Sequence, residues 1–253
     1  MKIFLTGKNG QVGSKLEEDL KKSHEIISTD RISLDLIGTQ HIKNTILLIK
    51  PDLIINAAAY TNVDQAEKEK DLAYRVNALA PKALTQVSKA LDIPIIHIST
   101  DYIFDGTKEG TYEEDDQANP QSVYGVTKWQ GEEFVRKYRK HFILRTSWVF
   151  SSKGNNFLKS IFKLAQEQTS LSVVDDLWGS PTSAQTLSMA IQVIIQYLNK
   201  NKNAEVYGTY HVASDGVTNW YLYACKILDT LESFKIKLKL KKDYLYPIPS
   251  NQY

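Results

Sequence analysis

A tyrosine and a lysine four residues apart, Tyr124 and Lys128, have the types and spacing that best suit acid–base chemistry in this chain. On a helix this spacing places both side chains on one face. A neighbouring ammonium favours the phenolate, so a phenol with a pKa of about 10 can exchange protons nearer neutrality. Such a phenol can protonate an oxygen while hydride arrives at the adjoining carbon. The same spacing also occurs where an exposed cation merely lies beside an aromatic residue, so the rest of the sequence has to decide.

A glycine-rich turn follows the first apolar run of the chain. Gly7, Gly10 and Gly13 come after a predicted strand and open into a predicted helix. In Rossmann folds such glycines allow a tight turn and let backbone N–H groups approach a pyrophosphate at the positive end of the helix. A plain strand-to-helix turn is the alternative, but the position at the start of an α/β chain favours dinucleotide binding.

Charged residues end the second predicted strand. An acid at this point, here Asp30, commonly accepts the ribose hydroxyls of NAD, whereas an adjacent arginine, here Arg31, can receive the 2′-phosphate of NADP. The pair leaves NADH and NADPH both open, and Asp30 can also simply cap a turn. A few residues on, Asp35 and Leu36 form an acid–apolar pair that can flank an adenine ring.

Small and hydroxyl-bearing residues end the next two predicted strands. The third strand runs into three alanines, 57–59, which leave room either for a ligand or for tight helix–sheet packing. The fourth runs into Thr100 and Asp101, at the sheet edge where open α/β folds bind ligands. There the Thr100 hydroxyl can hydrogen-bond a substrate carbonyl oxygen and complete a set with the tyrosine and lysine, although Ser-Thr-Asp is also an ordinary cap.

Apolar runs alternate with amphipathic stretches through residues 1–150, which predicts an α/β fold with a Rossmann-type, doubly wound parallel sheet. The predicted strands are Lys2–Thr6, Glu25–Thr29, Asp52–Asn56, Ile93–Ser99 and Phe142–Thr146. The predicted helices are Gln11–Lys22, Thr39–Lys50, Asp71–Leu91 and Ser122–Lys140. Residues 151–253 predict a smaller C-terminal substrate lobe, interleaved with the first region. Its predicted helices and strands are Asn156–Glu167, Ser183–Lys200, Trp220–Glu232, Ser172–Val174 and Thr209–Ala213.

The composition excludes several other classes of protein. A net charge of +2 gives no electrostatic case for nucleic acid binding, and no apolar run approaches membrane-spanning length. The first residues pass directly into the glycine turn, so no signal peptide is expected. The single cysteine, Cys225, excludes an intramolecular disulfide and a multi-cysteine zinc site. Four histidines, His24, His41, His141 and His211, are scattered with no ligand spacing, so no zinc site is predicted. We therefore expect a cytoplasmic protein.

Seven motifs together give the chain a resemblance to the extended short-chain dehydrogenase/reductase superfamily and, within it, to the dTDP-4-dehydrorhamnose reductase family. They are GKNGQVG at 7–13, NAAAYTNVDQAE at 56–67, STDYIFDG at 99–106, YGVTK at 124–128, RTSWVF at 145–150, GNNF at 154–157 and GSPT at 179–182. The resemblance spans nearly the whole chain. It implies an NAD(P)H-dependent oxidoreductase that acts on a nucleotide-linked sugar.

The resemblance also implies roles for individual residues. Those that match its cofactor contacts are Gly10, Gln11, Val12, Asp30, Asp35, Leu36, Ala59, Tyr60 and Thr61. Thr100, Tyr124 and Lys128 match its catalytic set, with Tyr124 as the proton donor and Lys128 also holding the nicotinamide ribose. Thr100, Asp101 and Trp148 match substrate contacts, and Tyr102 lies beside them. From the residues alone, Trp148 can equally be a core aromatic.

The implied reaction is the reduction of the C4 ketone of dTDP-4-dehydro-L-rhamnose to dTDP-L-rhamnose, for surface polysaccharides. Tyr124 would protonate the developing alkoxide, Lys128 would lower the pKa of the phenol, and Thr100 would orient the carbonyl. Two alternatives stay open. One is a reductase of another nucleotide-linked 4-keto-6-deoxysugar, and the other is a non-catalytic subunit on the same scaffold, like the regulatory subunit of methionine adenosyltransferase.

Two departures from the family pattern affect these expectations. Some members hold Mg²⁺ at a dimer interface with acidic residues, one of them on the first helix, where this chain has Lys15. That puts a magnesium site in doubt and leaves a homodimer open. The chain also ends at Tyr253, where family members continue into a short basic tail, which leaves open whether the second region is truncated.

Overall fold

The computed structural model describes residues 1–201 and 205–252, which form two compact units. The first unit comprises Met1–Thr146 and Gln185–Val212, and the second comprises Ser147–Ala184 and the chain from Ala213 on. The sequence predicts the division after residue 150, with the second region interleaved with the first. Residues 185–212 belong to the first unit.

A parallel sheet forms the centre of the first unit. Within the described residues it has six strands in the order β10-β5-β4-β3-β1-β2, and each neighbouring pair is parallel. The strands are β1 (Lys2–Thr6), β2 (Glu25–Thr29), β3 (Leu53–Asn56), β4 (Ile95–Thr100), β5 (His141–Thr146) and β10 (Gly208–His211). The chain leaves β1 toward β2 and later extends from β3 the other way, which confirms the predicted doubly wound, Rossmann-type sheet. The strand order therefore reverses between β1 and β3, where open α/β sheets bind ligands.

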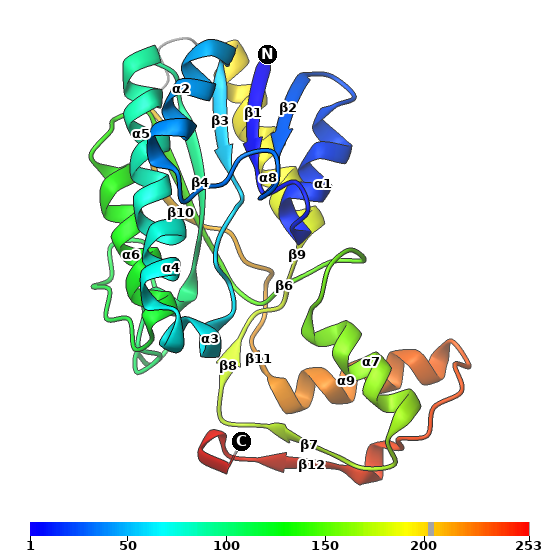
Figure 1. Ribbon diagram of the computed structural model, residues 1–253. Coiled ribbons are helices and arrows are strands. Elements are labelled where there is room, and N and C mark those ends of the chain that lie inside the picture. Colours follow the sequence, from blue (N-terminus) through cyan, green and yellow to red (C-terminus); the bar gives the residue numbers. More distant parts are fainter. Residues whose placement is uncertain (202–204, 253) are drawn as a thin grey trace. The chain divides into compact units, whose positions relative to one another are not determined.

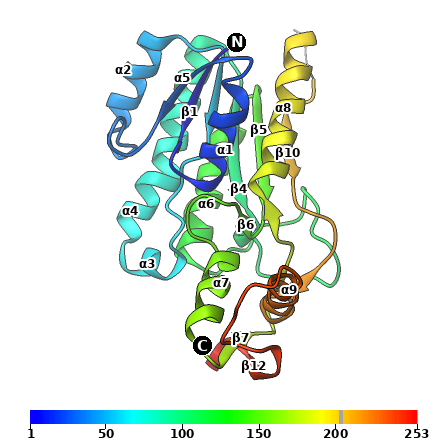
Figure 2. The same cartoon turned by 90° about the vertical axis from the view of Figure 1, so that its right-hand side faces the viewer.

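Helices cover both faces of this sheet, as Figures 1 and 2 show. On one face lie α2 (Thr39–Ile49), α5 (Ala80–Leu91) and α6 (Val123–Arg136), and on the other lie α1 (Gln11–Leu20) and α8 (Ala184–Lys200). Apolar side chains from β1, β3, β4 and β5 pack with those of α2, α5 and α6 in one buried cluster. Burying an apolar stripe on each helix against the sheet is the main favourable term for such a layer.

Strand β10 and helix α8 lie in the first unit, although the sequence predicts both in the second region. Every residue of β5 is buried, so its outer edge needs a partner for its backbone N–H and C=O groups. Strand β10 supplies this partner, pairing Gly208 with Phe142 and His211 with Arg145. Helix α8 buries Leu187, among other apolar residues.

The stretch predicted as one helix at Asp71–Leu91 is a continuous run with a different turn in its middle. It comprises α4 (Lys70–Tyr74), a π-helical turn η1 (Arg75–Leu79) and α5. Such turns insert one extra residue and often occur at functional sites. A short helix that the sequence did not predict, α3 (Val63–Lys68), precedes it and is capped by the side chain of Asn62.

The second unit packs helices and short strands around its own core. Its elements are β6 (Val149–Phe150), α7 (Phe157–Glu167), β7 (Leu171–Val174), β8 (Trp178–Gly179), β9 (Thr182–Ser183), β11 (Thr218–Asn219), α9 (Trp220–Ser233), η3 (Lys242–Tyr244), β12 (Leu245–Ile248) and η4 (Ser250–Gln252). Apolar residues of α7, α9, β7 and β12 form one buried cluster. Across residues 1–201 and 205–252, no helix has both the length and the apolar character needed to cross a membrane.

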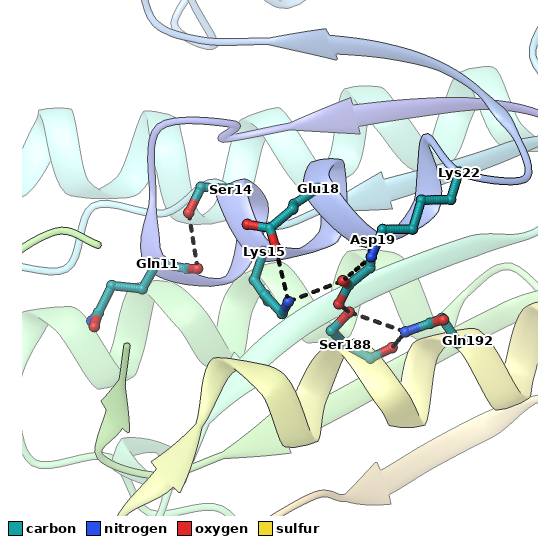
Figure 3. A network of polar contacts seen from close by, with 8 residues as sticks. All are labelled: Gln11, Ser14, Lys15, Glu18, Asp19, Lys22, Ser188 and Gln192. Carbon is teal, nitrogen blue, oxygen red and sulfur yellow. Dashed lines mark hydrogen bonds and ion pairs between the residues drawn. The ribbon is translucent and has the colours of Figure 1, made fainter. Parts of the chain in front are cut away.

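A polar network joins α1 to α8 within the first unit (Figure 3). The Ser188 hydroxyl on α8 donates to Asp19 Oδ2 on α1 at 2.7 Å, and Lys15 Nζ donates to Asp19 Oδ1 at 2.9 Å. Burial alone would raise the pKa of Asp19, but the hydrogen bonds from Lys15 and Ser188 outweigh it and hold this pKa below 3.8. The network therefore fixes the two helices that cover this face of the sheet.

Ser188→Ala should lower the free energy of unfolding by roughly 1.5–3 kcal/mol at pH 7, because it removes the buried donor to a charged carboxylate. The folded-state pKa of Asp19 is depressed, so its stabilisation is present above its unfolded pKa and is lost as the pH falls through the folded value. The difference in free energy of unfolding between Ser188→Ala and the unchanged protein should therefore become smaller below about pH 4. Urea unfolding at several pH values measures both effects.

Ser14→Ala is the matched control, because the Ser14 hydroxyl donates to the carbonyl of Gln11 within the same stretch of chain. A loss in Ser188→Ala no larger than in Ser14→Ala would contradict the role assigned to the network.

Candidate active site

The tyrosine and the lysine of the predicted pair lie on the first turns of α6, and both are buried. Tyr124 is 8% exposed and Lys128 is 2% exposed. The helix begins after Ser122, whose side-chain oxygen accepts from Gly125 N at 3.1 Å and so caps the first turn. The spacing of four residues thus places both groups on one side of a helix whose N-terminus is capped.

Lys128 extends from α6 to the neighbouring strand. Its Nζ donates to the carbonyl oxygen of Ile98 in β4 at 2.7 Å. Burial lowers the pKa of Lys128 to about 8, against the opposite effect of the nearby Glu132 carboxylate. This lysine is therefore a cation near neutrality and loses its charge at a pH well below that of an ordinary lysine.

Burial raises the pKa of Tyr124, and the nearby charge of Asp101 raises it further, while a hydrogen bond with Thr100 acts the other way. The sequence predicted the opposite direction, with the ammonium of Lys128 favouring the phenolate. The predicted direction is wrong for the structure, because burial has the largest effect on the pKa of this phenol. A phenol held in its protonated form suits a proton donor.

The end of β4 brings three further predicted residues beside Tyr124. Thr100 Oγ1 donates to Asp101 Oδ1 at 3.1 Å and accepts from Tyr102 N at 3.2 Å. Burial raises the pKa of Asp101 to about 6, although its hydrogen bonds oppose this. The ring of Tyr102 meets that of Tyr124 edge to face, with centroids 5.4 Å apart. Hydroxyl, carboxyl and phenol groups thus converge at the carboxyl end of a central parallel strand, the usual place for a ligand in such a fold.

Two glycines let α6 come this close to its neighbours. A Cβ on Gly125 would lie 2.2 Å from Tyr102 O, and one on Gly131 would lie 2.1 Å from Asn77 O. Neither space admits a side chain. The position of α6 beside its neighbours therefore depends on Gly125, which is inside the Y-G-x-x-K motif, and on Gly131, which lies outside it.

The glycine turn is equally tight. Gly7 has a φ of +78°, and a Cβ there would lie 2.8 Å from Ala58 N, while one on Gly13 would lie 2.0 Å from Gly7 O. Gln11 and Val12 lie between these contacts as the first two residues of α1, with Gly10 at its N-cap. The alanines after β3 thus pack closely on the turn, and the start of α1 offers backbone N–H groups of the kind that bind pyrophosphate.

Asp30 caps its own turn, as one of its two interpretations predicted. Its Oδ1 accepts from Ile32 N at 3.1 Å and from Ser33 N at 2.8 Å. The Ser33 hydroxyl also donates to Oδ1, and the backbone and side-chain hydrogen bonds from Ser33 lower the pKa of Asp30. Its Oδ2 lies 3.4 Å from Lys8 Nζ. The sequence reasoning missed Lys8, which is inside the glycine motif but has no recognisable spacing to Asp30.

The other predicted cofactor residues are spread around the turn. Asp35 Oδ1 accepts from Ile37 N, and Leu36 packs on the core cluster. Hydrogen bonds from Gln65 and Tyr60 lower the pKa of Glu69, and the charge of Arg31 adds to this effect. These contacts give Asp35 and Leu36 local structural roles and place Arg31 near Glu69.

Asn77 is a second residue that the sequence reasoning missed. It lies on the π-helical turn, is buried, and accepts from Tyr60 N at 2.8 Å while donating to Tyr60 O at 3.1 Å and to Thr127 Oγ1 at 3.2 Å. It therefore fixes the loop that carries Ala59, Tyr60 and Thr61 to helix α6. A lone asparagine in an apolar helical stretch was the signal that could have found it.

The residues present do not fit a magnesium ion on α1. Lys15 Nζ lies 2.9 Å from Asp19 Oδ1 and 3.3 Å from Glu18 Oε1, so an ammonium already neutralises the carboxylates there (Figure 3). Among the described residues, no group of three or more His, Cys, Asp or Glu side chains is placed to hold a metal ion.

Trp148, the remaining predicted substrate residue, belongs to the second unit. It has a left-handed backbone, with φ of 45°, and its ring stacks on that of Trp220. Its indole is partly exposed.

Comparisons of sequence and of structure with known proteins all identify the same family. The family model described as RmlD substrate binding domain matches residues 1–253. The dTDP-4-dehydrorhamnose reductase of Escherichia coli K12 is 39% identical over 259 residues, covering 100% of this chain and 85% of the relative. Among solved structures, the reductase of the same name from Clostridium acetobutylicum has a TM-score of 0.91 at 36% identity, with 100% and 85% covered. The Bacillus anthracis reductase, solved in complex with NADP, has a TM-score of 0.90 at 36% identity, with 99% and 85% covered.

Gly125→Ala should destabilise the protein by about 1–3 kcal/mol, because the added methyl group overlaps Tyr102 O. In an unobstructed helix the same change would stabilise by about 1 kcal/mol, so the sign itself tests the close approach. Val126→Ala, at an exposed neighbour on the same helix, is the control and should change stability little. Thermal or urea unfolding that shows Gly125→Ala to be the more stable protein would contradict the geometry.

Proposed function

This chain belongs to the dTDP-4-dehydrorhamnose reductase family, and we propose that it reduces the C4 ketone of dTDP-4-dehydro-L-rhamnose to dTDP-L-rhamnose, for surface polysaccharides. The observation that carries the proposal is the convergence of Thr100, Tyr124 and Lys128 at the end of β4, with Tyr124 and Lys128 buried on one side of α6. The Escherichia coli and Clostridium acetobutylicum relatives bear the name of this activity, and the match covers 85% of each of them.

Each residue of the set has a distinct part in the reaction. The reduced nicotinamide supplies the hydride that adds to C4. Tyr124 gives its phenolic proton to the carbonyl oxygen, which becomes the hydroxyl oxygen of the product. Thr100 orients that oxygen by a hydrogen bond, and the charge of Lys128 stabilises the phenolate left behind. The reduction thus consumes one hydride, which a bound reduced nicotinamide would supply by being oxidised, and one proton, which Tyr124 supplies.

The glycine turn fits a dinucleotide, because Gly7 and Gly13 leave no room for a Cβ where the backbone must approach a pyrophosphate. NADPH is the cofactor that the charges favour. The carboxylate of Asp30 is already engaged by two backbone N–H groups and lies beside Lys8, so it is less available to ribose hydroxyls. Lys8 and Arg31 are two cations near this strand end that suit a 2′-phosphate.

Further parts of the proposal concern the rest of the molecule. Asp101, Tyr102 and Trp148 bind the sugar nucleotide, the second unit serves as its substrate lobe, and the enzyme works in the cytoplasm. A homodimer is supported by an apolar stripe on α8 formed by Met189, Val193 and Tyr197, which are 58%, 64% and 41% exposed.

Tyr124→Phe should lower kcat by about 10²- to 10⁴-fold, because it removes the proton donor and keeps the ring. The assay follows NADPH absorbance with the 4-keto sugar nucleotide. Tyr138→Phe is the matched control, since Tyr138 is also buried and its hydroxyl has no hydrogen-bond partner among the described residues. Undiminished activity in Tyr124→Phe would refute the assignment.

The same assay separates the alternatives. Turnover of a different 4-keto-6-deoxysugar, with the product identified by NMR, would indicate a related reductase. Copurification with a larger enzyme, without any ketosugar reduction, would indicate a non-catalytic subunit.

Activity should decline as the pH rises through about 8, because Lys128 then loses the charge that stabilises the phenolate. Below that pH the lysine is charged, and the raised pKa of Tyr124 keeps its proton in place throughout. A pH profile of kcat at saturating NADPH measures this limb. Lys128→Arg keeps its charge at this pH, so its kcat should be lower but should not fall as the pH rises through about 8. The same fall of kcat in this variant would mean that another group causes it.

A further inference from the structure

Trp148 has a backbone conformation that bulky residues rarely adopt. Its φ of 45° lies in the left-handed region, which is unfavourable for a large side chain and persists only where the surroundings determine it. Thr182 N donates to Trp148 O at 3.3 Å, at the point where β6 pairs with β9.

Two neighbours in the second unit hold this indole. Its ring stacks on that of Trp220, with centroids 3.4 Å apart and planes 10° from parallel. Gly179 packs against it so closely that a Cβ there would lie 2.6 Å from Trp148 Cε2. The indole is thus fixed both by a face-to-face contact and by a position that tolerates no side chain.

Trp220 is itself anchored from behind. It is the first residue of α9, directly after the cap formed by Asn219, whose Oδ1 accepts from Leu222 N at 2.7 Å. Its ring also contacts Phe157 with centroids 4.5 Å apart and packs on the buried cluster of the unit. Trp148 therefore rests on a ring that the core of the unit keeps in place.

We propose that Trp220 is a positioning residue for the sugar: it holds Trp148 so that the partly exposed indole meets the apolar side of a 6-deoxyhexose. This inference rests on the proposed function, in which Trp148 contacts the sugar nucleotide. A 6-deoxyhexose carries a methyl group at C6 and ring C–H groups, which suit contact with an aromatic face. A fixed indole binds such a surface without first losing its own conformational freedom.

The test compares Trp220→Leu, Trp220→Phe and Tyr223→Leu in the full chain. Trp220→Leu should raise KM for the sugar nucleotide about tenfold, the scale of an aromatic pair, and leave KM for NADPH unchanged. Trp220→Phe keeps a stackable ring and should restore most of the affinity. Tyr223 lies in the same aromatic cluster, with its centroid 6.5 Å from that of Trp220, and Tyr223→Leu should leave KM for the sugar nucleotide near that of the unchanged protein.

Near-ultraviolet circular dichroism provides a readout that does not need turnover. Trp148→Leu and Trp220→Leu should each remove the same band from the stacked indoles, and the double variant should remove no more. Unchanged KM for the sugar nucleotide in Trp220→Leu, or an equal rise in Tyr223→Leu, would overturn the proposal. If no ketosugar is reduced by the unchanged protein, the proposed function fails, and binding of dTDP-L-rhamnose followed by calorimetry in the same variants then decides the positioning role separately.

Discussion

The close approach of α6 to its neighbours is the constraint on which the site depends. At Gly125 and Gly131 the helix backbone touches the carbonyls of Tyr102 and Asn77. Between these two glycines, Lys128 Nζ donates to Ile98 O in β4 at 2.7 Å. The arrangement of the proposed catalytic residues therefore depends on backbone packing at two positions that have no side chain.

A buried ion pair supports the same helix one turn further on. Glu132 of α6 and Arg145 of β5 are 0% and 2% exposed in their side chains, and Arg145 Nη2 donates to Glu132 Oε2 at 2.9 Å. Arg145 Nη1 also donates to Glu114 O, in the segment that follows the end of β4. Removing one partner of such a pair would leave an uncompensated buried charge, so the pair ties α6, β5 and this segment into one arrangement. Glu132 also opposes the effect of burial on the pKa of Lys128, which links the ion pair to the candidate site.

The sequence predicted those features that depend on local pattern. Strands β1 and β2 have the predicted bounds, because short apolar runs between turns are a local signal. The glycine turn and the tyrosine–lysine spacing are local in the same sense. Asn77 bonds to Tyr60, which lies 17 residues away in the sequence, and Lys8 pairs with Asp30, which lies 22 residues away. No sequence-spacing rule predicts either contact. The direction of the Tyr124 pKa was missed because burial, which no single sequence reports, outweighs a neighbouring charge. The pairing of β10 with β5 was not predicted, because the sequence of a short strand does not indicate which sheet edge it joins.

The return of residues 185–212 to the first unit has a consequence for synthesis on the ribosome. The chain passes between the two units three times, after Thr146, Ala184 and Val212. Strand β5 emerges long before its neighbour β10, so the outer edge of the growing sheet stays unpaired while about sixty further residues are made. An exposed edge of this kind invites pairing with other nascent chains. The nascent polypeptide can therefore mispair at this edge until β10 has left the exit tunnel and paired with β5, with His211 opposite Arg145.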